Sequence, residues 1–359
     1  MHGAPDLTSL SASSWGRICL FGEHQDYLGL PVIAAAVDLH ITITGTRRDD
    51  RVIALDLPDI GESCVYALGT ELPYAHDRDY LPAVLNVLRR AGIVPGQGWT
   101  CTVRGTIPIN AGSSSSSALV VAWVKFVLAA AGATRTPEEI AILANRAEVL
   151  EFGEPGGLMD HYLSALGSLY FLDFTHQPAR VEHLPAHLTG FVLGNSLEPK
   201  ATTGVLREAR LAAEQALAWV RAHAPELDFR TDSLAAFEEI FPAMPAELRR
   251  SLRANLINRD LCREGRALLR HTTIDPARLG ALLLEHHRQL AEGIGVSTPK
   301  LDRMIDAAMA AGALGGKLNG SGGGGCMYAY APGREAEVAA ALETAGGQAT
   351  ILTIPPGPA

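Results

Sequence analysis

The chain has 359 residues, of which 47% are apolar and 19% charged, so it is long enough for two domains that each bury a core. Its 39 acidic and 30 basic side chains leave a formal charge of −9, which excludes broad attraction to nucleic acid or to anionic membranes. The sequence shows neither a secretory signal nor an apolar run long enough to span a bilayer, so we expect a cytoplasmic protein without membrane or nucleic-acid partners.

In the first half of the chain, strand patterns and helix patterns alternate. Apolar and β-branched residues dominate from 17 to about 56, and side chains alternate strictly at 41–44 and again at 100–104. Thr136 followed by Pro137 is typical of an N-cap and the first residue of a helix. We predict helices over residues 81–91, 118–131, 137–152 and 159–166, followed by a strand over 167–174.

The composition changes near residue 180, after which long, charged, amphipathic helices follow one another. The predicted elements are helices over 205–222, 248–270, 274–292 and 334–344 and strands over 326–330 and 348–354. Because the order lacks the regular alternation of a doubly wound sheet, we predict an α+β protein of two lobes. We expect an N-terminal domain over 1–185 and a C-terminal domain over 186–359.

A strand-like segment at 16–21 leads directly into a polar cluster. The cluster includes Glu23, His24, Asp26 and Tyr27. A sugar or polyol site needs rigidly held donors and acceptors of this kind, because each hydroxyl group both donates and accepts a hydrogen bond. An ordinary polar turn with solvated carboxylates is the alternative interpretation.

Small residues precede the apolar helix predicted from residue 118. The run Pro-Ile-Asn-Ala-Gly at 108–112 is followed by serines at 113–117. A helix start exposes unpaired backbone N–H groups and the positive end of the helix dipole, so this arrangement favours a bound anion. Serine hydroxyls there add hydrogen bonds or bind Mg²⁺. The alternative is a long N-cap region without a ligand.

Seven of the eleven residues at 315–325 are glycine, and such a backbone approaches a ligand closely. Residues 320–325 match the dinucleotide-binding fingerprint by chance, since a strand rather than a helix is predicted to follow them. The sequence has no Gly-x-x-x-x-Gly-Lys-Ser/Thr motif, which excludes a Walker-type phosphate loop.

The order and spacing of these three motifs resemble those of the GHMP kinases, small-molecule kinases related to galactokinase, homoserine kinase and mevalonate kinase. Residues 16–27 are similar to the galactokinase signature Gly-Arg-Val-Asn-Leu-Ile-Gly-Glu-His-Thr-Asp-Tyr, apart from conservative changes and from Cys19 and Gln25. Residues 147–148 and 157–161 read Ala-Glu and Gly-Leu-Met-Asp-His, where galactokinases have Ala-Glu and Gly-Ile-Met-Asp-Gln. The resemblance covers nearly the whole chain.

The resemblance implies a two-lobed GHMP kinase fold, with an N-terminal lobe like ribosomal protein S5 domain 2, a C-terminal ferredoxin-like α+β lobe, and the active site between the lobes. It also implies ATP and Mg²⁺ as cofactors, with Ser116 and Glu148 as the Mg²⁺ ligands. The residues that it implies for ATP binding are Asn110, Ala111, Gly112, Ser113, Ser114, Ser115, Ser116, Gly320, Gly322 and Gly323.

For the reaction, the resemblance implies ATP-dependent phosphorylation of a monosaccharide, at the anomeric hydroxyl as in galactokinases. Asp160 would accept the proton of the sugar hydroxyl, and Arg17 would keep that carboxylate ionised and counter charge on the transferring phosphoryl group. The residues implied to contact the substrate are Glu23, His24, Asp26, Tyr27 and Gly157.

The resemblance to galactokinase is incomplete after the central strand. Galactokinases have a Tyr-Asn-x-Arg-Arg run there, whose tyrosine packs on the sugar, whereas residues 203–210 contain no tyrosine. A pyranose that differs from galactose at C4 or C6, or a uronic acid, would fit the same reaction. The alternatives are a mevalonate-type kinase of a non-sugar alcohol and a regulator that binds ATP and sugar without catalysis. In each case we expect a monomer or a homodimer.

Overall fold

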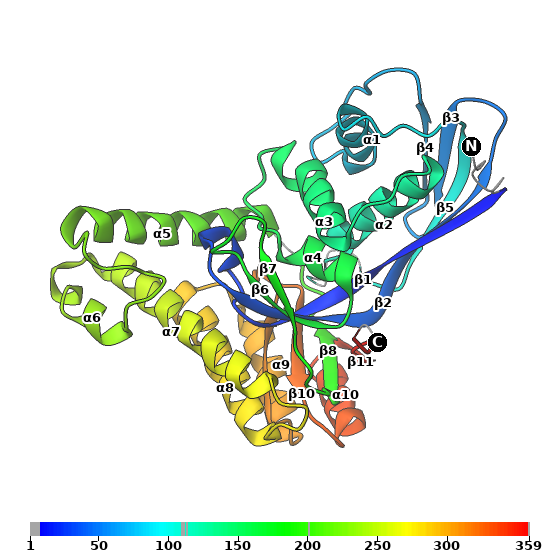
Figure 1. Cartoon of the computed structure of the whole chain (residues 1–359). Coiled ribbons are helices and arrows are strands. Elements are labelled where there is room, and N and C mark those ends of the chain that lie inside the picture. The colour runs from blue at the N-terminus through cyan, green and yellow to red at the C-terminus, as the bar shows by residue number, and fades with distance from the viewer. Residues whose placement is uncertain (1–7, 109–111, 113, 200–201, 358–359) are drawn as a thin grey trace. The chain divides into compact units, whose positions relative to one another are not determined.

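The computed structural model describes residues 8–108, 112, 114–199 and 202–357 (Figure 1). These residues cluster into two compact units, neither of which is one continuous piece of chain. Unit 1 draws on Met1–Arg17, Asp38–Ile109 and Ser114–Gly167, and unit 2 draws on Ile18–Val37, Asn110–Ser113 and Ser168–Ala359.

Unit 1 is built on strands whose side chains alternate between the interior and solvent. β3 (Val52–Leu57) pairs antiparallel with β4 (Glu62–Ala67) and parallel with β5 (Trp99–Gly105). β5 also pairs antiparallel with the second half of β2 (Val32–Arg47), and β1 (Ser9–Phe21) pairs with β2. In β2, Ile41 and Ile43 are buried and Thr44 is exposed, which confirms the alternation predicted from the sequence.

The helices of unit 1 are α1 (Tyr80–Arg90), α2 (Ser115–Ala130), α3 (Pro137–Asn145) and α4 (Met159–Leu166). α2 is apolar all round and largely buried, since α1, α3 and α4 pack around it (Figure 1). α3 begins at the predicted position, where Thr136 and Glu139 form a capping box. The α-helix does not continue to residue 152 as predicted, because the chain widens into a π-helical turn, η2 (Arg146–Leu150).

Unit 2 contains strands from both ends of the chain. The first residues of β2, Val32 to Ala35, pair antiparallel with β6 (Leu169–Asp173), which pairs with β7 (Arg180–His183). A separate antiparallel sheet runs in the order β11-β8-β10-β9. Its strands are β8 (Phe191–Asn195), β9 (Gly315–Asn319), β10 (Cys326–Tyr330) and β11 (Gln348–Leu352).

β9 takes the first five residues of the glycine-rich stretch, so only the part after Asn319 is a loop. Glycine is required in the strand by a close approach to β10. A Cβ on Gly316 would lie 2.8 Å from the carbonyl oxygen of Tyr328. The pairing of β9 with β10 therefore depends on a residue type that is uncommon in strands.

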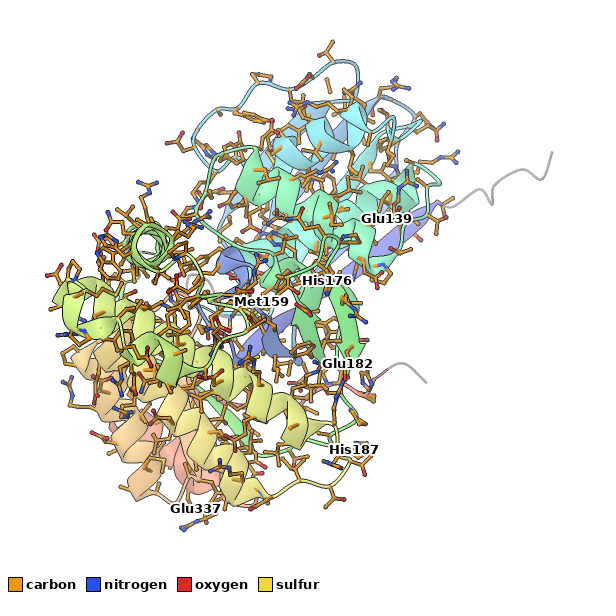
Figure 2. The ribbon with its side chains drawn as sticks, turned by 60° about the vertical axis from the view of Figure 1, so that its left-hand side comes forward. Glu139, Met159, His176, Glu182, His187 and Glu337 are labelled. Carbon is orange, nitrogen blue, oxygen red and sulfur yellow. The ribbon has the colours of Figure 1, made fainter. Side chains whose placement is uncertain are left out.

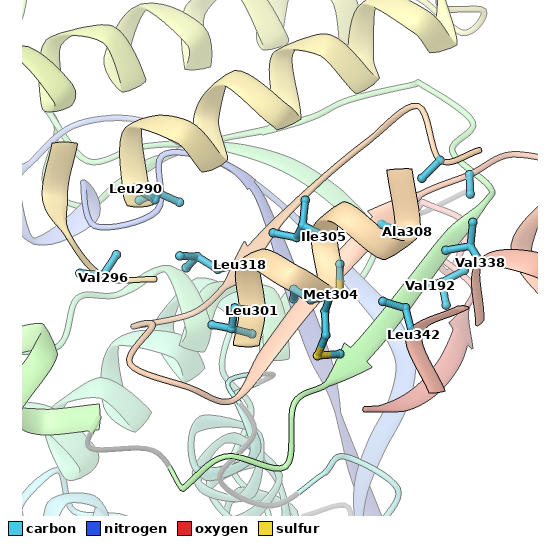
Figure 3. Close-up of a cluster of buried hydrophobic side chains, with 14 of the residues drawn as sticks. Val192, Leu290, Val296, Leu301, Met304, Ile305, Ala308, Leu318, Val338 and Leu342 are labelled. Carbon is cyan, nitrogen blue, oxygen red and sulfur yellow. The ribbon is translucent and has the colours of Figure 1, made fainter. Parts of the chain in front are cut away.

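The helices of unit 2 are α5 (Thr202–His223), α6 (Leu234–Glu238), α7 (Ala246–Leu269), α8 (Pro276–Arg288), α9 (Pro299–Ala310) and α10 (Glu335–Thr344). α9 and α10 cover one face of the four-stranded sheet, where Met304 and Leu342 pack with Val192 (Figure 3). A second apolar cluster joins α5, α6 and α7 through Val220, Phe237 and Leu256. In the part of the chain that the structure describes, none of the helices has the length and apolar character needed to cross a bilayer.

Candidate active site

The predicted phosphate-binding segment ends in the first turn of α2. Ser115 and Ser116 are the first two residues of the helix, which starts before the position 118 expected from the sequence. Ser114 precedes them with a φ of 61°, in the left-handed region. The N–H groups of this first turn have no partners within the helix and are suited to an anion. Of the remaining predicted residues, Asn110, Ala111 and Ser113 lie outside the described part of the chain.

A bidentate ion pair joins β1 to α4 within unit 1. Arg17 donates from Nε to Oδ1 of Asp160 at 2.7 Å and from Nη2 to Oδ2 at 2.8 Å. Met159, labelled in Figure 2, is the first residue of α4, so Asp160 lies in its first turn. The side chain of Arg17 is 4% exposed and that of Asp160 is 28% exposed, so the carboxylate keeps an accessible side.

The pKa of Asp160 lies below the ordinary value of an aspartate. Burial, the largest single influence, raises this pKa, but the positive charge and hydrogen bonds of Arg17, the Ser114 hydroxyl and His161 together bring it below that value. The Ser114 hydroxyl lies close enough to Asp160 to lower its pKa. Among the described residues, however, Ser114 Oγ makes no hydrogen bond of normal geometry. Asp160 is therefore ionised at neutral pH and able to accept a proton.

The π-helical turn η2 carries Glu148 into the interior of unit 1. His161 Nε2 donates a hydrogen bond to Glu148 Oε2 at 2.8 Å, and the two side chains are 2% and 7% exposed. Burial raises the pKa of Glu148, but the hydrogen bond and charge of His161, together with the nearby Ser116 and Ser117 hydroxyls, bring it below its ordinary value. Glu148 is thus a buried carboxylate beside the start of α2.

Ser116 and Glu148, the predicted Mg²⁺ ligands, fit the chemistry of that ion. They present one hydroxyl and one carboxylate, the hard oxygen donors that Mg²⁺ takes. Within the described ranges, no group of three or more His, Cys, Asp or Glu side chains could hold a metal. So small a donor set suits an ion that keeps several waters and binds phosphate oxygens, rather than one held in an all-protein cage.

The polar cluster that follows β1 belongs to unit 2, and its glutamate lies in the interior. Glu23 Oε2 is 2.7 Å from Lys317 Nζ, and the two side chains are 2% and 0% exposed. The Lys317 ammonium also donates to the carbonyl oxygens of Cys19 and Leu318. Glu23 therefore ties the cluster to β9, and its contact with a substrate stays a prediction.

His24, Asp26 and Tyr27 form one turn around the short 3-10 helix Asp26–Leu28. His24 Nε2 donates to the Ser321 carbonyl oxygen at 3.1 Å, so in the neutral ring Nδ1 accepts from the Tyr27 hydroxyl, also at 3.1 Å. Asp26 Oδ1 accepts the backbone N–H of Tyr27 at 2.9 Å. Burial raises the pKa of Tyr27, over whose ring the Arg210 guanidinium lies at 5.6 Å from the centroid.

The glycine-rich segment meets the polar cluster at Ser321. Its predicted ATP-binding residues, all with positive φ, are Gly320, Gly322 and Gly323. Asn319 donates from Nδ2 to the carbonyl oxygen of Gly112 at 3.1 Å and accepts the N–H of Cys19 at 3.0 Å. Unit 2 thus brings together the polar cluster, the glycine-rich segment and one described residue of the predicted phosphate loop.

Gly157, the remaining predicted substrate contact, lies in unit 1, where its carbonyl oxygen accepts a hydrogen bond from Asn145 Nδ2 at 2.9 Å. Neither His161 nor Lys317 is among the residues that the sequence predicts for the site. The signal for His161 was its position, because it stands where galactokinases have glutamine. No local pattern could show that Lys317 contacts Glu23, which is 294 positions away.

Comparison with known families gives three matches. The model of the GHMP kinases N terminal domain matches residues 79–168, and that of the GHMP kinases C terminal region matches residues 266–348. The galactokinase galactose-binding signature matches residues 3–47. These ranges contain Glu148 and Asp160, the glycine-rich segment, and the polar cluster with Arg17, respectively.

Similarity to individual proteins extends along almost the whole chain. Mevalonate kinase of Thermococcus onnurineus is 31% identical over 352 residues, with 96% of this chain and 95% of the relative covered. Galactokinase of Haemophilus influenzae is 25% identical over 338 residues, covering 91% and 86%. The crystal structure of Lactococcus lactis galactokinase complexed with galactose superposes with a TM-score of 0.80 at 23% identity, covering 97% and 94%.

These similarities define the class of the protein, an ATP-dependent phosphotransferase that acts on a small molecule. The chain belongs to the GHMP kinase family. The predicted fold, a mixed α and β structure with the N- and C-terminal domains of that family, is confirmed. The division of the chain after residue 185 stays a prediction.

Proposed function

We propose that this protein transfers the γ-phosphoryl group of ATP to a monosaccharide, at the anomeric hydroxyl. The observation that carries the proposal is the pair of Arg17 and Asp160, in which a buried guanidinium holds an ionised, accessible carboxylate through two hydrogen bonds. Asp160 accepts the proton of the sugar hydroxyl while the hydroxyl oxygen attacks the γ-phosphorus and ADP leaves. Arg17 keeps the carboxylate ionised and counters charge on the transferring group.

We propose that the start of α2 and the glycine-rich segment bind the phosphates of ATP. Backbone N–H groups and serine hydroxyls at 110–116, with Gly320, Gly322 and Gly323, supply the donors. Ser116 and Glu148 would hold Mg²⁺, which when bound neutralises charge on the phosphate oxygens. The protein itself would orient the Ser116 hydroxyl and the Glu148 carboxylate at the start of α2.

The galactose-binding signature at residues 3–47 supports a sugar as the acceptor, because that range contains the whole polar cluster. We propose that the sugar contacts Glu23, His24, Asp26, Tyr27 and Gly157. The lack of a tyrosine at 203–210 favours a pyranose other than galactose, or a uronic acid.

Mevalonate kinases that are 31% identical over nearly the whole chain favour a second candidate acceptor, a non-sugar alcohol such as mevalonate. The two candidates share the transfer from ATP and differ in the acceptor pocket. A mevalonate-type pocket should be largely apolar, whereas residues 23–27 carry hydroxyl-binding groups.

An assay that couples ADP release to a colour change, run across neutral sugars, uronic acids and mevalonate, tests the proposal. Turnover with a sugar, and a phosphorus NMR spectrum of a sugar 1-phosphate, would support it. Turnover with mevalonate alone would select the second candidate. Nucleotide binding without turnover on any acceptor would indicate a regulator that binds without catalysis.

Asp160→Asn tests the role of the base, because it preserves the shape of the side chain and removes its ability to accept the proton. We expect turnover to fall by about 10²- to 10⁴-fold, with nucleotide binding unchanged by calorimetry. The matched control is Asp50→Asn, an exposed carboxylate paired with Arg48, which should leave turnover unaltered. Wild-type turnover in Asp160→Asn would refute the assignment.

A further inference from the structure

The His161 side chain contacts Glu148, one of the two residues proposed to hold Mg²⁺. Both side chains are almost completely buried, and the hydrogen bond from Nε2 to Oε2 is 2.8 Å long. The other ring nitrogen, Nδ1, is buried without a hydrogen-bond partner among the described residues. Among the described residues, Glu148 is therefore the hydrogen-bond partner of the His161 ring.

This contact limits how the Glu148 carboxylate can turn. Glu148 stands on the π-helical turn η2, and a turn of that kind is wider and less regular than the α-helix before it. A donor on Oε2 fixes rotation about the last bond of the side chain and so sets the direction of the second oxygen. The Ser116 and Ser117 hydroxyls at the start of α2 lie beside the same carboxylate.

We infer that His161 is a positioning residue for Mg²⁺, which it serves by holding the Glu148 carboxylate in the orientation that the ion requires. The inference rests on the proposed function, in which Glu148 and Ser116 bind the ion. Groups that orient a metal ligand from behind typically change metal affinity by about 10- to 100-fold when they are removed.

Two amides provide a matched pair of variants. The amide nitrogen of Gln is as many bonds from Cα as Nε2 of His, so His161→Gln can still donate to Glu148. The amide nitrogen of Asn is one bond nearer, at the place of Nδ1, so His161→Asn cannot reach it. His161→Met fills the same space without a donor, so it tests the loss of the hydrogen bond without burying an amide that could itself destabilise the fold. Melting curves of the three variants show whether each one is folded.

The measurement is ADP binding by calorimetry across a series of Mg²⁺ concentrations, with no phosphoryl acceptor present. In EDTA all variants should bind ADP like the wild type. With Mg²⁺, His161→Gln should follow the wild type, and His161→Asn and His161→Met should need about tenfold more Mg²⁺ for the same gain in affinity. On a Glu148→Gln background, changing His161 should have no further effect.

Equal Mg²⁺ requirements in the wild type, His161→Asn and His161→Met would overturn the inference. So would an equal loss in His161→Gln, or an effect of His161 that persists without the Glu148 carboxylate. Failure of the proposed function is a separate result, namely a wild-type protein that binds ADP with Mg²⁺ and phosphorylates no sugar.

Discussion

Arg17 and Asp160 determine each other's chemistry. Burial alone would favour a protonated Asp160, and a guanidinium that is 4% exposed would be costly to leave without a negative partner. Two parallel hydrogen bonds, which join residues 143 positions apart, meet both needs. Asp160, the proposed base, is therefore ionised by its contact with Arg17.

Replacing Arg17 should change the pH dependence of turnover. In Arg17→Met the opposing charge is gone, so burial dominates and the pKa of Asp160 rises. Because the base must be ionised, the acid limb of kcat/KM should move to higher pH, and activity lost at neutral pH should partly return in more alkaline buffer. Profiles of kcat/KM against pH measure this.

The matched control is Arg48→Met, which breaks an exposed pair with Asp50 and should leave the pH profile in place. An Arg17→Met enzyme with an unmoved acid limb would show that Arg17 does not control the ionisation of Asp160.

At this scale, residues within a motif could be predicted and residues that act through long-range contacts could not. Asp160 and Glu148 stand in short runs that resemble those of known kinases, and the structure places each with a neighbour that keeps it ionised. Lys317 looks like any lysine in a glycine-rich run, and only folding brings it to Glu23. Its burial depends on contacts that no local pattern encodes.

Among the elements, α3 matters because it leads directly into the turn that carries Glu148. Thr136 Oγ1 accepts the N–H of Glu139 at 3.2 Å, and Glu139, labelled in Figure 2, accepts the N–H of Thr136 at 2.8 Å. Thr136→Ala should lower the free energy of unfolding by about 1 kcal/mol. Denaturant titration measures it, and Thr136→Ser, which keeps the hydroxyl, is the control. Equal stability in the alanine and serine variants would contradict this role.

Elements with a regular apolar spacing could be predicted from the sequence, a start signal alone was not sufficient, and elements without either signal could not be predicted. The helix at 81–91 was found within one residue at each end, since its apolar spacing is regular. α9 was missed although Thr298 and Pro299 give it the same start signal as α3. β9 and η2 carry no local sequence signal. Glycine is uncommon in strands, and whether a helix widens into a π-helical turn is decided by the packing around it.

For the whole molecule, each unit is assembled from separate stretches of chain. Residues 18–37 belong to unit 2, where Leu30 packs with Phe237 and the Gln25 amide donates to the carbonyl oxygen of Asn255 at 2.8 Å. The composition changes only near residue 180, so composition alone could not reveal this early segment of unit 2. Contacts between distant residues, not local character, define the unit.

The ion pair of Glu23 and Lys317 should therefore stabilise unit 2 as a whole. Lys317→Met leaves a buried carboxylate without its cation and should lower the free energy of unfolding by about 3–5 kcal/mol. Adding Glu23→Gln to that variant should restore part of the loss, since the unpaired charge is then removed as well. Chemical denaturation followed by tyrosine fluorescence and circular dichroism measures both steps. A Lys317→Met protein as stable as the wild type would refute the structural role of the pair.

The π-helical turn at Arg146–Leu150 has a consequence for comparing this chain with its relatives. A turn of this kind amounts to an α-helix with one residue inserted, which rotates everything downstream by about 100° around the axis. Buried Glu148 lies inside this turn, and Leu150 at its end is 66% exposed. An alignment that treats residues 137–150 as one uninterrupted α-helix will therefore misjudge which face the residues of the turn share with α3. In distant homologues, the equivalent of Glu148 should be sought by the direction in which a side chain points around the helix axis, and not by its position in the sequence alone.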